Sequence, residues 1–467
     1  MKEKKVKKVK EPKVIHALIV FAVLIAAMGA GILIFDAGVH ISMFIGVCAA
    51  AIMALYLGFD WQFIEDSMIE GIKNSLQAVI ILIIVGILIG VWILTGVVPA
   101  MIYYGLKLLS PAIFLIAATL ICSVTSISTG TSWGTVGTMG LALIGIAVGL
   151  GIPAPLAAGA ILSGAYFGDK MSPLSDTTNL AAAMAGTDVF THVKFMMKPT
   201  MITYVISLVI YGILGMKYST NVGADVSQVQ IMSDGISSMF NINPLLLLPP
   251  VIVVAAVAMK ISAIPGITLG IFAGVLVGVI FQDGITFGEI LNVGMDGYTC
   301  ESGIEALDNL LSCGGIDNMM FSISLTIIAM MFGGIMERTG MLGVVVNKIV
   351  GFAKKPVSLL VATEATCILS NVVMPEQYIS IVVPGRMYAK TYRDMKLHPK
   401  TLSNALESSG TVSSVLVPWN TCGVYMAGVL GVTTAQYLPY CFFNLLMPVM
   451  TVILAVVGGI TLAKLDD

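Results

Sequence analysis

Charged residues are scarce in this sequence: Asp, Glu, Lys and Arg make up 11% of 467 residues, whereas hydrophobic residues make up 57%. A soluble domain has about 25% charged residues, so the composition excludes a soluble globular protein. The net charge of −2 says nothing about partners, but because the charges are few and segregated along the chain we do not expect nucleic acid as a partner. We therefore expect a protein that lies in a lipid bilayer.

Histidine and cysteine are also rare, at 4 and 7 residues. The sequence has no His-Glu-x-x-His motif and no cysteine pair with zinc spacing, and Ser408 and Ser409 have no accompanying base. We therefore expect that the protein is not an enzyme and holds no cofactor. Cys300 and Cys313 share one polar connection, where either a disulfide or two free thiols would fit.

The apolar residues are concentrated in runs long enough to cross a bilayer. The first run follows seven lysines and is too long for the apolar core of a signal peptide, so residues 1–13 are expected to form a basic cytoplasmic tail. Together the runs predict an all-α polytopic membrane protein. They lie at residues 14–35, 41–58, 75–95, 199–216, 243–261, 264–281, 318–337 and 438–461.

Two parts of the chain match at a separation of 245 residues. This shift carries Pro111 to Pro356 and Pro173 to Pro418, and polar segments of the same kind lie beside both pairs. Internal repeats of this kind are common in transporters, so we expect two copies of one unit. The expected segments are a first transmembrane repeat (14–217), an extracytoplasmic linker (218–242) and a second transmembrane repeat (243–467).

The distribution of Lys and Arg sets the orientation of the spans, because these residues collect in cytoplasmic loops. Five basic residues lie between 386 and 400, whereas the connection 283–317 has seven acidic residues and no basic ones. With five spans and one re-entrant hairpin in each repeat, the basic loop lies inside and the acidic connection outside. An odd number of spans makes the two repeats inverted and places both termini in the cytoplasm.

Each repeat contains a hairpin whose tip is too polar for contact with lipid. The tips are expected at 123–135 and 370–377. Non-helical backbone at this depth is tolerated only against protein or water, although a closely packed Ser/Thr-rich helix would also explain the first tip. The tip residues expected to bind ions or substrate are Ser126, Ser128, Thr129, Thr131, Ser132, Ser370 and Asn371.

A polar stretch interrupts an otherwise apolar helix near residue 170. Pro173 predicts a break between Asp169 and Asp176, and a broken helix exposes backbone groups that bind ions. A carboxylate in such a cavity can exchange a proton for sodium. Alternatively, Asp169 pairs with Lys170, and Asp176 caps the second half-helix. The candidates are Asp169, Ser172, Ser175, Asp176, Thr177, Thr178 and Asn179.

The second repeat has its acids at other positions. Thr421 stands at the place of Asp176, and Glu407 is the best candidate for a second proton or cation carboxylate, with Glu364 and Glu376 as alternatives. The further candidates in this repeat are Ser408, Ser409, Asn420 and Thr421. The expected sodium ligands are Asp169, Asp176 and Glu407.

Three motifs resemble the NhaC-type sodium/proton antiporters of the ion-transporter superfamily. They are the Thr-Ser-Trp-Gly-Thr run at 131–135, the Asp-Lys-Met-Ser-Pro-Leu-Ser-Asp-Thr-Thr run at 169–178 and the Ser-Cys-Gly-Gly-Ile-Asp-Asn-Met run at 312–319. The resemblance implies a multi-pass protein of the prokaryotic cytoplasmic membrane that performs secondary transport. The family includes exchangers of malate and a proton for lactate and sodium, and members that handle amino acids. Cys313 stands where many members have arginine.

The sequence thus predicts a sodium/proton antiporter that works by alternating access. The alternative is a sodium- and proton-coupled exchanger of organic acids such as malate and lactate, or an amino-acid transporter, since hydroxyls and amides at half-helix N-termini could hold a carboxylate. A channel is disfavoured because the polar elements are unlike broken helices rather than a symmetric ring. A homodimer is also compatible with the sequence.

Overall fold

The computed structural model describes residues 9–35, 38–221, 226–259, 261–351 and 354–465. The first eight residues of the expected basic tail therefore lie outside the described residues. The described chain is helical and contains one isolated β-bridge, between Leu397 and Lys464, but no strand. The helices up to residue 221 are α1 (Val14–Leu33), α2 (Val39–Leu57), α3 (Trp61–Leu94), α4 (Val97–Leu108), α5 (Pro111–Thr129), α6 (Ser132–Gly149), α7 (Ala154–Met171), α8 (Asp176–Ala185) and α9 (Val189–Asn221).

The rest of the chain continues in the same way and adds short 3₁₀ and π segments, which are labelled η. These elements are α10 (Val226–Met239), η1 (Pro244–Leu247), α11 (Leu248–Ala258), α12 (Ala263–Phe281), α13 (Phe287–Asp296), α14 (Glu305–Leu311), α15 (Gly315–Arg338), α16 (Met341–Val350), α17 (Pro356–Val373), α18 (Gln377–Asp394), α19 (Pro399–Leu406), η2 (Glu407–Thr411), η3 (Ser414–Leu416), α20 (Thr421–Leu430), α21 (Thr434–Tyr437), η4 (Leu438–Tyr440) and α22 (Phe442–Gly458).

Many of these helices are long and apolar enough to cross a membrane. In the described part of the chain nine helices meet this condition, and the number rises to eleven if each of two bent helix pairs counts as one span. The bends are 98° between α10 and η1–α11, and 55° between α21–η4 and α22. These findings confirm the predicted all-α polytopic membrane protein.

The structure adds helices at three places where the sequence shows only approximate boundaries. The stretch 59–74, which separates the expected runs 41–58 and 75–95, is largely helical, because α3 begins at Trp61, where the Asp60 carboxylate caps it by accepting from the Phe63 amide at 2.8 Å. The expected linker 218–242 contains α10, and the expected span 243–261 is a short 3₁₀ turn followed by α11, bent sharply against α10. Apolar composition alone did not reveal these bends.

The two halves repeat the same order of helices with nearly identical boundaries. The helices α5, α6, α7 and α8 begin 245 residues before α17, α18, α19 and α20, respectively. Before them, α4 and α16 each follow a glycine in the left-handed region, Gly96 at φ 79° and Gly340 at φ 77°. The match that the sequence shows at its prolines therefore extends to the helix starts.

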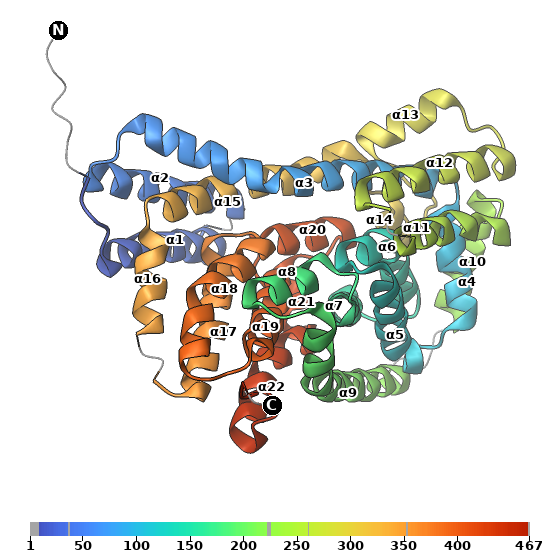
Figure 1. Ribbon diagram of the computed structural model, residues 1–467. Helices are drawn as coiled ribbons and strands as arrows, with labels where there is room; N and C mark the ends of the chain where they lie inside the picture. Colours follow the sequence, from blue (N-terminus) through green and yellow to red (C-terminus); the bar gives the residue numbers. More distant parts are fainter. Residues whose placement is uncertain (1–8, 36–37, 222–225, 260, 352–353, 466–467) are drawn as a thin grey trace, which may run out of the picture.

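The long helices α3 and α15 occupy equivalent places in the two halves and pack against each other, as the upper part of Figure 1 shows. They run antiparallel, because Gly71 of α3 lies at Gly334 of α15 whereas Gly86 lies at Gly315. A Cβ atom on Gly71 would lie 2.1 Å from the Met330 carbonyl oxygen. The two backbones are therefore in direct contact along a glycine seam.

The glycine seam makes a stability prediction. Gly71→Ala is expected to lower the free energy of unfolding by about 1–3 kcal/mol, because the new methyl group meets backbone rather than a movable side chain. Gly343→Ala on α16 is the matched control, since a Cβ there meets nothing within 4 Å. Thermal unfolding of the purified proteins in detergent tests this; equal unfolding temperatures for the two variants would contradict it.

Candidate ion-binding site

Asp169, near the end of α7, joins the first hairpin to the break in the first broken helix. One carboxylate oxygen, Oδ2, accepts from the Ser132 amide at 3.1 Å and from the Ser132 hydroxyl at 2.7 Å, while Oδ1 accepts from the Ser175 hydroxyl at 2.6 Å. The neighbouring Lys170 points elsewhere and donates to Ser408 Oγ at 3.1 Å. Asp169 thus holds the start of α6 against the break between α7 and α8.

The first hairpin tip packs directly on this break. The Ser172 hydroxyl donates to the Ile127 carbonyl at 2.7 Å, and a Cβ on Gly130 would lie 2.8 Å from the Leu174 carbonyl carbon. Gly130 also has φ 70°, which favours glycine. The expected tip 123–135 is therefore much shorter than predicted, because α5 continues to Thr129 and only Gly130 and Thr131 are non-helical.

The second hairpin and the second broken helix repeat this contact with different side chains. Asn371 Nδ2 donates to the Gly410 carbonyl at 2.7 Å, and the Thr421 amide donates to the Pro375 carbonyl at 2.9 Å. Asn420 Nδ2 donates to Asn371 Oδ1 at 3.1 Å, and Trp419 Nε1 donates to the Val372 carbonyl at 2.7 Å. These bonds fix the tip 374–376 beside the start of α20.

The second arms of the two hairpins begin with equivalent N-caps. Thr131 caps α6 by accepting from the Gly134 amide at 3.2 Å, and Glu376 caps α18 by accepting from the Ile379 amide at 3.1 Å. Both N-termini carry the positive end of a helix dipole, which favours negative charge nearby. Glu376 is therefore a carboxylate at the place where the first half has a hydroxyl.

A small cavity brings the two halves together, and we call it the ion pocket. Its volume is about 150 Å³, and both hairpin tips, the start of α8 and one face of α3 form its walls. A wider cavity of about 450 Å³ adjoins it at Asp176 and reaches the loop before α12. The polar lining residues of the ion pocket include Asn74, Gln77, Thr131, Asp176, Glu376 and Gln377.

Two carboxylates from different halves therefore share the ion pocket. Asp176 is exposed to it as the first residue of α8, and the N-cap of that helix is Ser175, so the alternative role of Asp176 as the cap does not hold. Tyr378 of α18 lines the same pocket beside both carboxylates. Carboxylate, hydroxyl and amide oxygens are the ligands that a hard cation such as sodium prefers.

The remaining predicted residues lie around the pocket in different ways. Thr129 and Asn179 line the adjoining cavity. Ser126 donates to the Ala165 carbonyl, Ser128 to the Val124 carbonyl and Ser409 to the Ala405 carbonyl. The buried hydroxyls of Ser370 and Thr421 have no hydrogen-bond partner, while those of Thr177 and Thr178 bond to the break. Glu407 and Ser408 lie in a separate buried cluster with Lys170.

Sequence reasoning missed the contribution of α3 to this pocket. Asn74 and Gln77 are three residues apart and so share one face of the helix. Two amide side chains on one face of an apolar helix were the available signal, but the segment before residue 75 was interpreted as a loop. Glu376 was considered only as an alternative, because its cap role depends on where α18 begins.

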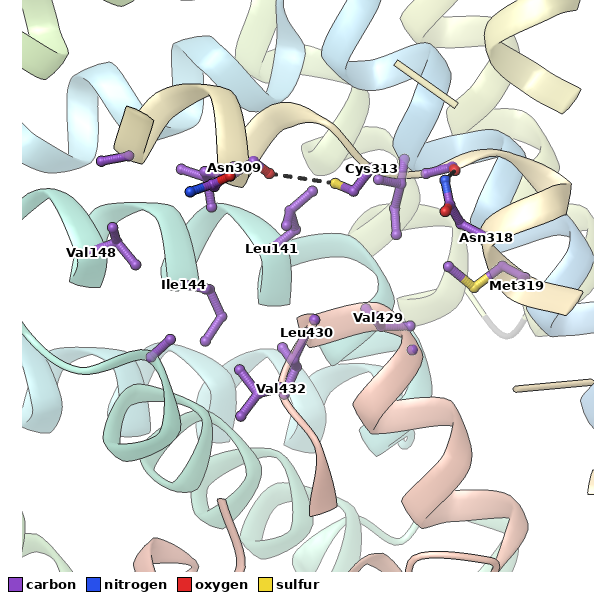
Figure 2. Close-up of a pocket in the computed structure, with 17 residues that line it drawn as sticks. Leu141, Ile144, Val148, Asn309, Cys313, Asn318, Met319, Val429, Leu430 and Val432 are labelled. Atoms are coloured by element: carbon purple, nitrogen blue, oxygen red, sulfur yellow. Dashed lines mark hydrogen bonds between the residues drawn. The ribbon is translucent and has the colours of Figure 1, made fainter. Parts of the chain in front are cut away.

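A third cavity, also of about 450 Å³, lies at the far ends of α6 and α20 (Figure 2). Leu141, Ile144 and Val148 of α6 face Leu430 and Val432 across it, and Asn309 and Cys313 lie above them in this view. Cys313 and Cys300 are both free thiols, so no disulfide joins them.

Two aromatic rings join the start of α6 to α20 beside the ion pocket. The rings of Trp133 and Tyr425 stack with their centroids 4.1 Å apart, and the Tyr425 hydroxyl donates to the Trp133 carbonyl at 3.0 Å. Trp133 also lines the ion pocket. This contact therefore ties the wall of the ion pocket to α20.

Comparison with known proteins agrees with this arrangement. The sequence model of the Na+/H+ antiporter family matches residues 12–166 and 164–459, which is nearly the whole chain. The chain belongs to the Na+/H+ antiporter family. The antiporter is 38% identical over 97% of its length to the malate-2H(+)/Na(+)-lactate antiporter of Bacillus subtilis, of which the match covers 96%.

Two further relatives show how the family varies. The antiporter is 35% identical to the Na(+)/H(+) antiporter NhaC of Alkalihalophilus pseudofirmus, over 96% of each chain. It is 36% identical to the arginine/ornithine antiporter ArcD of Halobacterium salinarum, over 96% of this chain and 93% of that protein. These comparisons confirm the resemblance found in the sequence motifs.

Proposed function

We propose that the protein exchanges sodium for protons across the cytoplasmic membrane and that both ions compete for the ion pocket. The observation that carries the proposal is the pairing of Asp176 and Glu376, one carboxylate from each half, in one small pocket with Thr131, Gln77 and Gln377. Two carboxylates attract a cation strongly, and each can instead take up a proton. A site of this kind binds either one sodium ion or protons.

Asp169 has a supporting part in this proposal. Its three donors hold Ser132 and Ser175 in place behind the pocket, so the hairpin tip and the break move together. In our proposal Glu376 replaces Glu407 as the carboxylate that the second half gives to the sodium site. The sodium ligands we propose are Asp176 and Glu376, with Asp169 as the group that positions their surroundings.

The antiparallel packing of α3 and α15 supports the proposed inversion of the two repeats. Equivalent helices that run in opposite directions through one membrane belong to oppositely oriented copies. We further propose that both termini and the basic loop 386–400 lie in the cytoplasm, as the distribution of Lys and Arg predicts. The ion pocket then opens toward the cytoplasm, and the stacked Trp133 and Tyr425 close the outer path.

A second candidate function is exchange of small organic acids coupled to sodium and protons. It is favoured by the relative from Bacillus subtilis that is named for malate and lactate. The 150 Å³ of the ion pocket suits an ion better than a dicarboxylate, but the adjoining cavity of about 450 Å³ could hold one. An organic acid would then bind in the adjoining cavity beside the sodium ion.

Transport by the purified protein in liposomes separates these functions. We expect an outward sodium gradient to drive protons into the liposome lumen with no organic acid present, as a pH-sensitive dye in the lumen would report. Malate and lactate are then added on opposite sides. Flux that requires both acids would favour the organic-acid exchanger, and dissipation of the gradient without coupling would favour a channel.

A further inference from the structure

A fully buried cluster of charged side chains lies apart from the ion pocket. Lys170 follows Asp169 in sequence but leaves the helix on another side, and its Nζ donates to Ser408 Oγ at 3.1 Å and lies 3.5 Å from Met196 Sδ. Two acids of the second half, Glu407 and Glu364, interact electrostatically with this ammonium group. Both acids are buried in the protein.

The acids of this cluster have few hydrogen-bond partners within the protein. Both carboxyl oxygens of Glu407 and the Oε1 atom of Glu364 are buried without a partner. An isolated buried carboxylate is strongly disfavoured, and one ammonium group can balance only one of two carboxylates. Charge balance therefore requires that one of the two acids carries a proton whenever Lys170 is charged.

The backbone around Glu407 is itself unusual. Glu407 begins η2, a π-helical turn that interrupts the regular helix continuing from α19. Such π turns are rare and occur often at functional sites, because they turn a side chain out of its regular helical direction. The first half has an unbroken α-helix at the equivalent place, where Leu162 stands for Glu407.

A column of polar side chains joins this cluster to one face of the protein. Ser408 donates to Asn404 Oδ1 one turn earlier at 3.2 Å. The hydroxyl of the preceding residue, Ser403, lies 2.8 Å from His192 Nδ1. The same hydroxyl donates to the Lys400 carbonyl oxygen at 3.0 Å, near the start of α19. His192 Nε2 and Asn404 Nδ2 are also buried without a partner.

This column ends in the basic loop that is predicted to be cytoplasmic. Hydroxyl, imidazole and carboxyl groups between Lys400 and Glu407 can take up and release protons, and the buried atoms without partners among them belong to Glu407, Asn404 and His192. The ion pocket opens at Asp176, on another side of α7 and α8. The two polar regions come close to each other at the break, where the Thr178 hydroxyl bonds to the carbonyl oxygens of Asp169 and Lys170.

We propose that Glu407, with Lys170 and Glu364, forms a proton-exchange site distinct from the sodium pocket and connected to the cytoplasm through Ser403, Asn404 and His192. In one state the Glu407 carboxyl group holds a proton. Glu364 carries its proton in both states. When the Glu407 O–H bond breaks, the proton leaves along the column to water at the basic loop, and the carboxylate that remains is balanced by the Lys170 ammonium group. The inference rests on the proposed sodium/proton exchange and adds a second proton position to it.

Other titratable groups around this site have secondary roles. Asp169 on α7 acts electrostatically on Glu407, while Tyr392 of α18 and Cys367 of α17 interact with Glu364. Lys170 also acts on His192. The electrostatic field at Glu407 therefore changes when the break beside Asp169 moves. This movement would couple the proton on Glu407 to the state of the ion pocket.

Glu407→Gln in liposomes tests the proposal with two measurements on one sample. The first is exchange of ²²Na⁺ at equal sodium concentrations on both sides, which requires the ion pocket but no net proton movement. The second is sodium-driven proton flux. We expect Glu407→Gln to keep the sodium exchange and to lose most of the proton flux, and we expect Glu337→Gln, an exposed acid on α15, to keep both.

Each of the other possible outcomes also supports or contradicts the separate proton site. The inference would be overturned if the ratio of proton flux to sodium exchange in Glu407→Gln equalled the ratio in the wild type. If that variant loses both activities, the double variant Lys170→Met with Glu407→Gln is measured, because it removes the ammonium group together with the acid and leaves Glu364 neutral when this acid carries a proton. Restored sodium exchange without proton flux would support the separate site, and a folded double variant without sodium exchange would overturn it. Absence of sodium exchange in the wild type would instead contradict the proposed function.

Discussion

Asp176→Asn is expected to reduce sodium-driven proton flux to the level of protein-free liposomes. Asparagine keeps the size of the side chain but removes the charge that attracts sodium and the group that exchanges a proton. Asp176 lies at the first residue of α8, where the helix dipole stabilises its carboxylate, and it faces Glu376 across the ion pocket. Because the side chain is exposed to the pocket, the folded state should tolerate the substitution.

Two companion variants make this result specific. Glu376→Gln keeps an acceptor oxygen for the Ile379 amide, so α18 stays capped while the pocket loses its second charge, and the same loss of flux is expected. Asp66→Asn on α3 removes an exposed carboxylate outside the pocket and should leave flux unchanged. Wild-type flux in Asp176→Asn would remove this residue from the mechanism.

Asp169→Asn is expected to abolish transport and also to destabilise the protein by about 1–3 kcal/mol. Asp169 accepts three hydrogen bonds from Ser132 and Ser175, and asparagine offers one acceptor oxygen in place of two. At least one buried donor then loses its partner, and the first hairpin tip is no longer held against the break. The unfolding temperature in detergent and the flux in liposomes are measured on the same preparation.

Ser132→Ala provides the graded comparison for Asp169. This substitution removes the 2.7 Å hydroxyl bond but keeps the bonds from the Ser132 amide and the Ser175 hydroxyl. We expect a smaller loss of stability and partial transport. Equal stability of Asp169→Asn and the wild type would show that this carboxylate does not join the tip to the break.

The sequence predicts the main features of the fold because they depend on local chemistry. Pro173 cannot donate a backbone hydrogen bond, and α7 ends two residues before it at Met171. The apolar runs predict most of the long helices, and the spacing of 245 residues predicts where the helices of the second half begin. Each of these features can be derived from a few neighbouring residues.

The pocket was harder to predict because it depends on contacts between distant segments. Asp176 was identified from its polar neighbours, but its partner in the pocket is Glu376 of the second half. Nothing near Glu376 in sequence shows that it faces α8, and the start of α3 at Trp61 was hidden by the acidic residues that follow it. Tertiary packing decides which polar residues of a membrane helix share a cavity.

The glycine seam between α3 and α15 restricts which parts of the molecule can move. Sliding one helix along the other would bring residues with side chains opposite the backbone contacts at Gly71 and Gly334, where even a Cβ atom does not fit. The two helices can therefore pack in one register only, and the pair forms a rigid axle, that is, a fixed part about which other helices can rotate. We expect alternation between the two sides of the membrane to occur by rotation of the hairpins and broken helices about this axle.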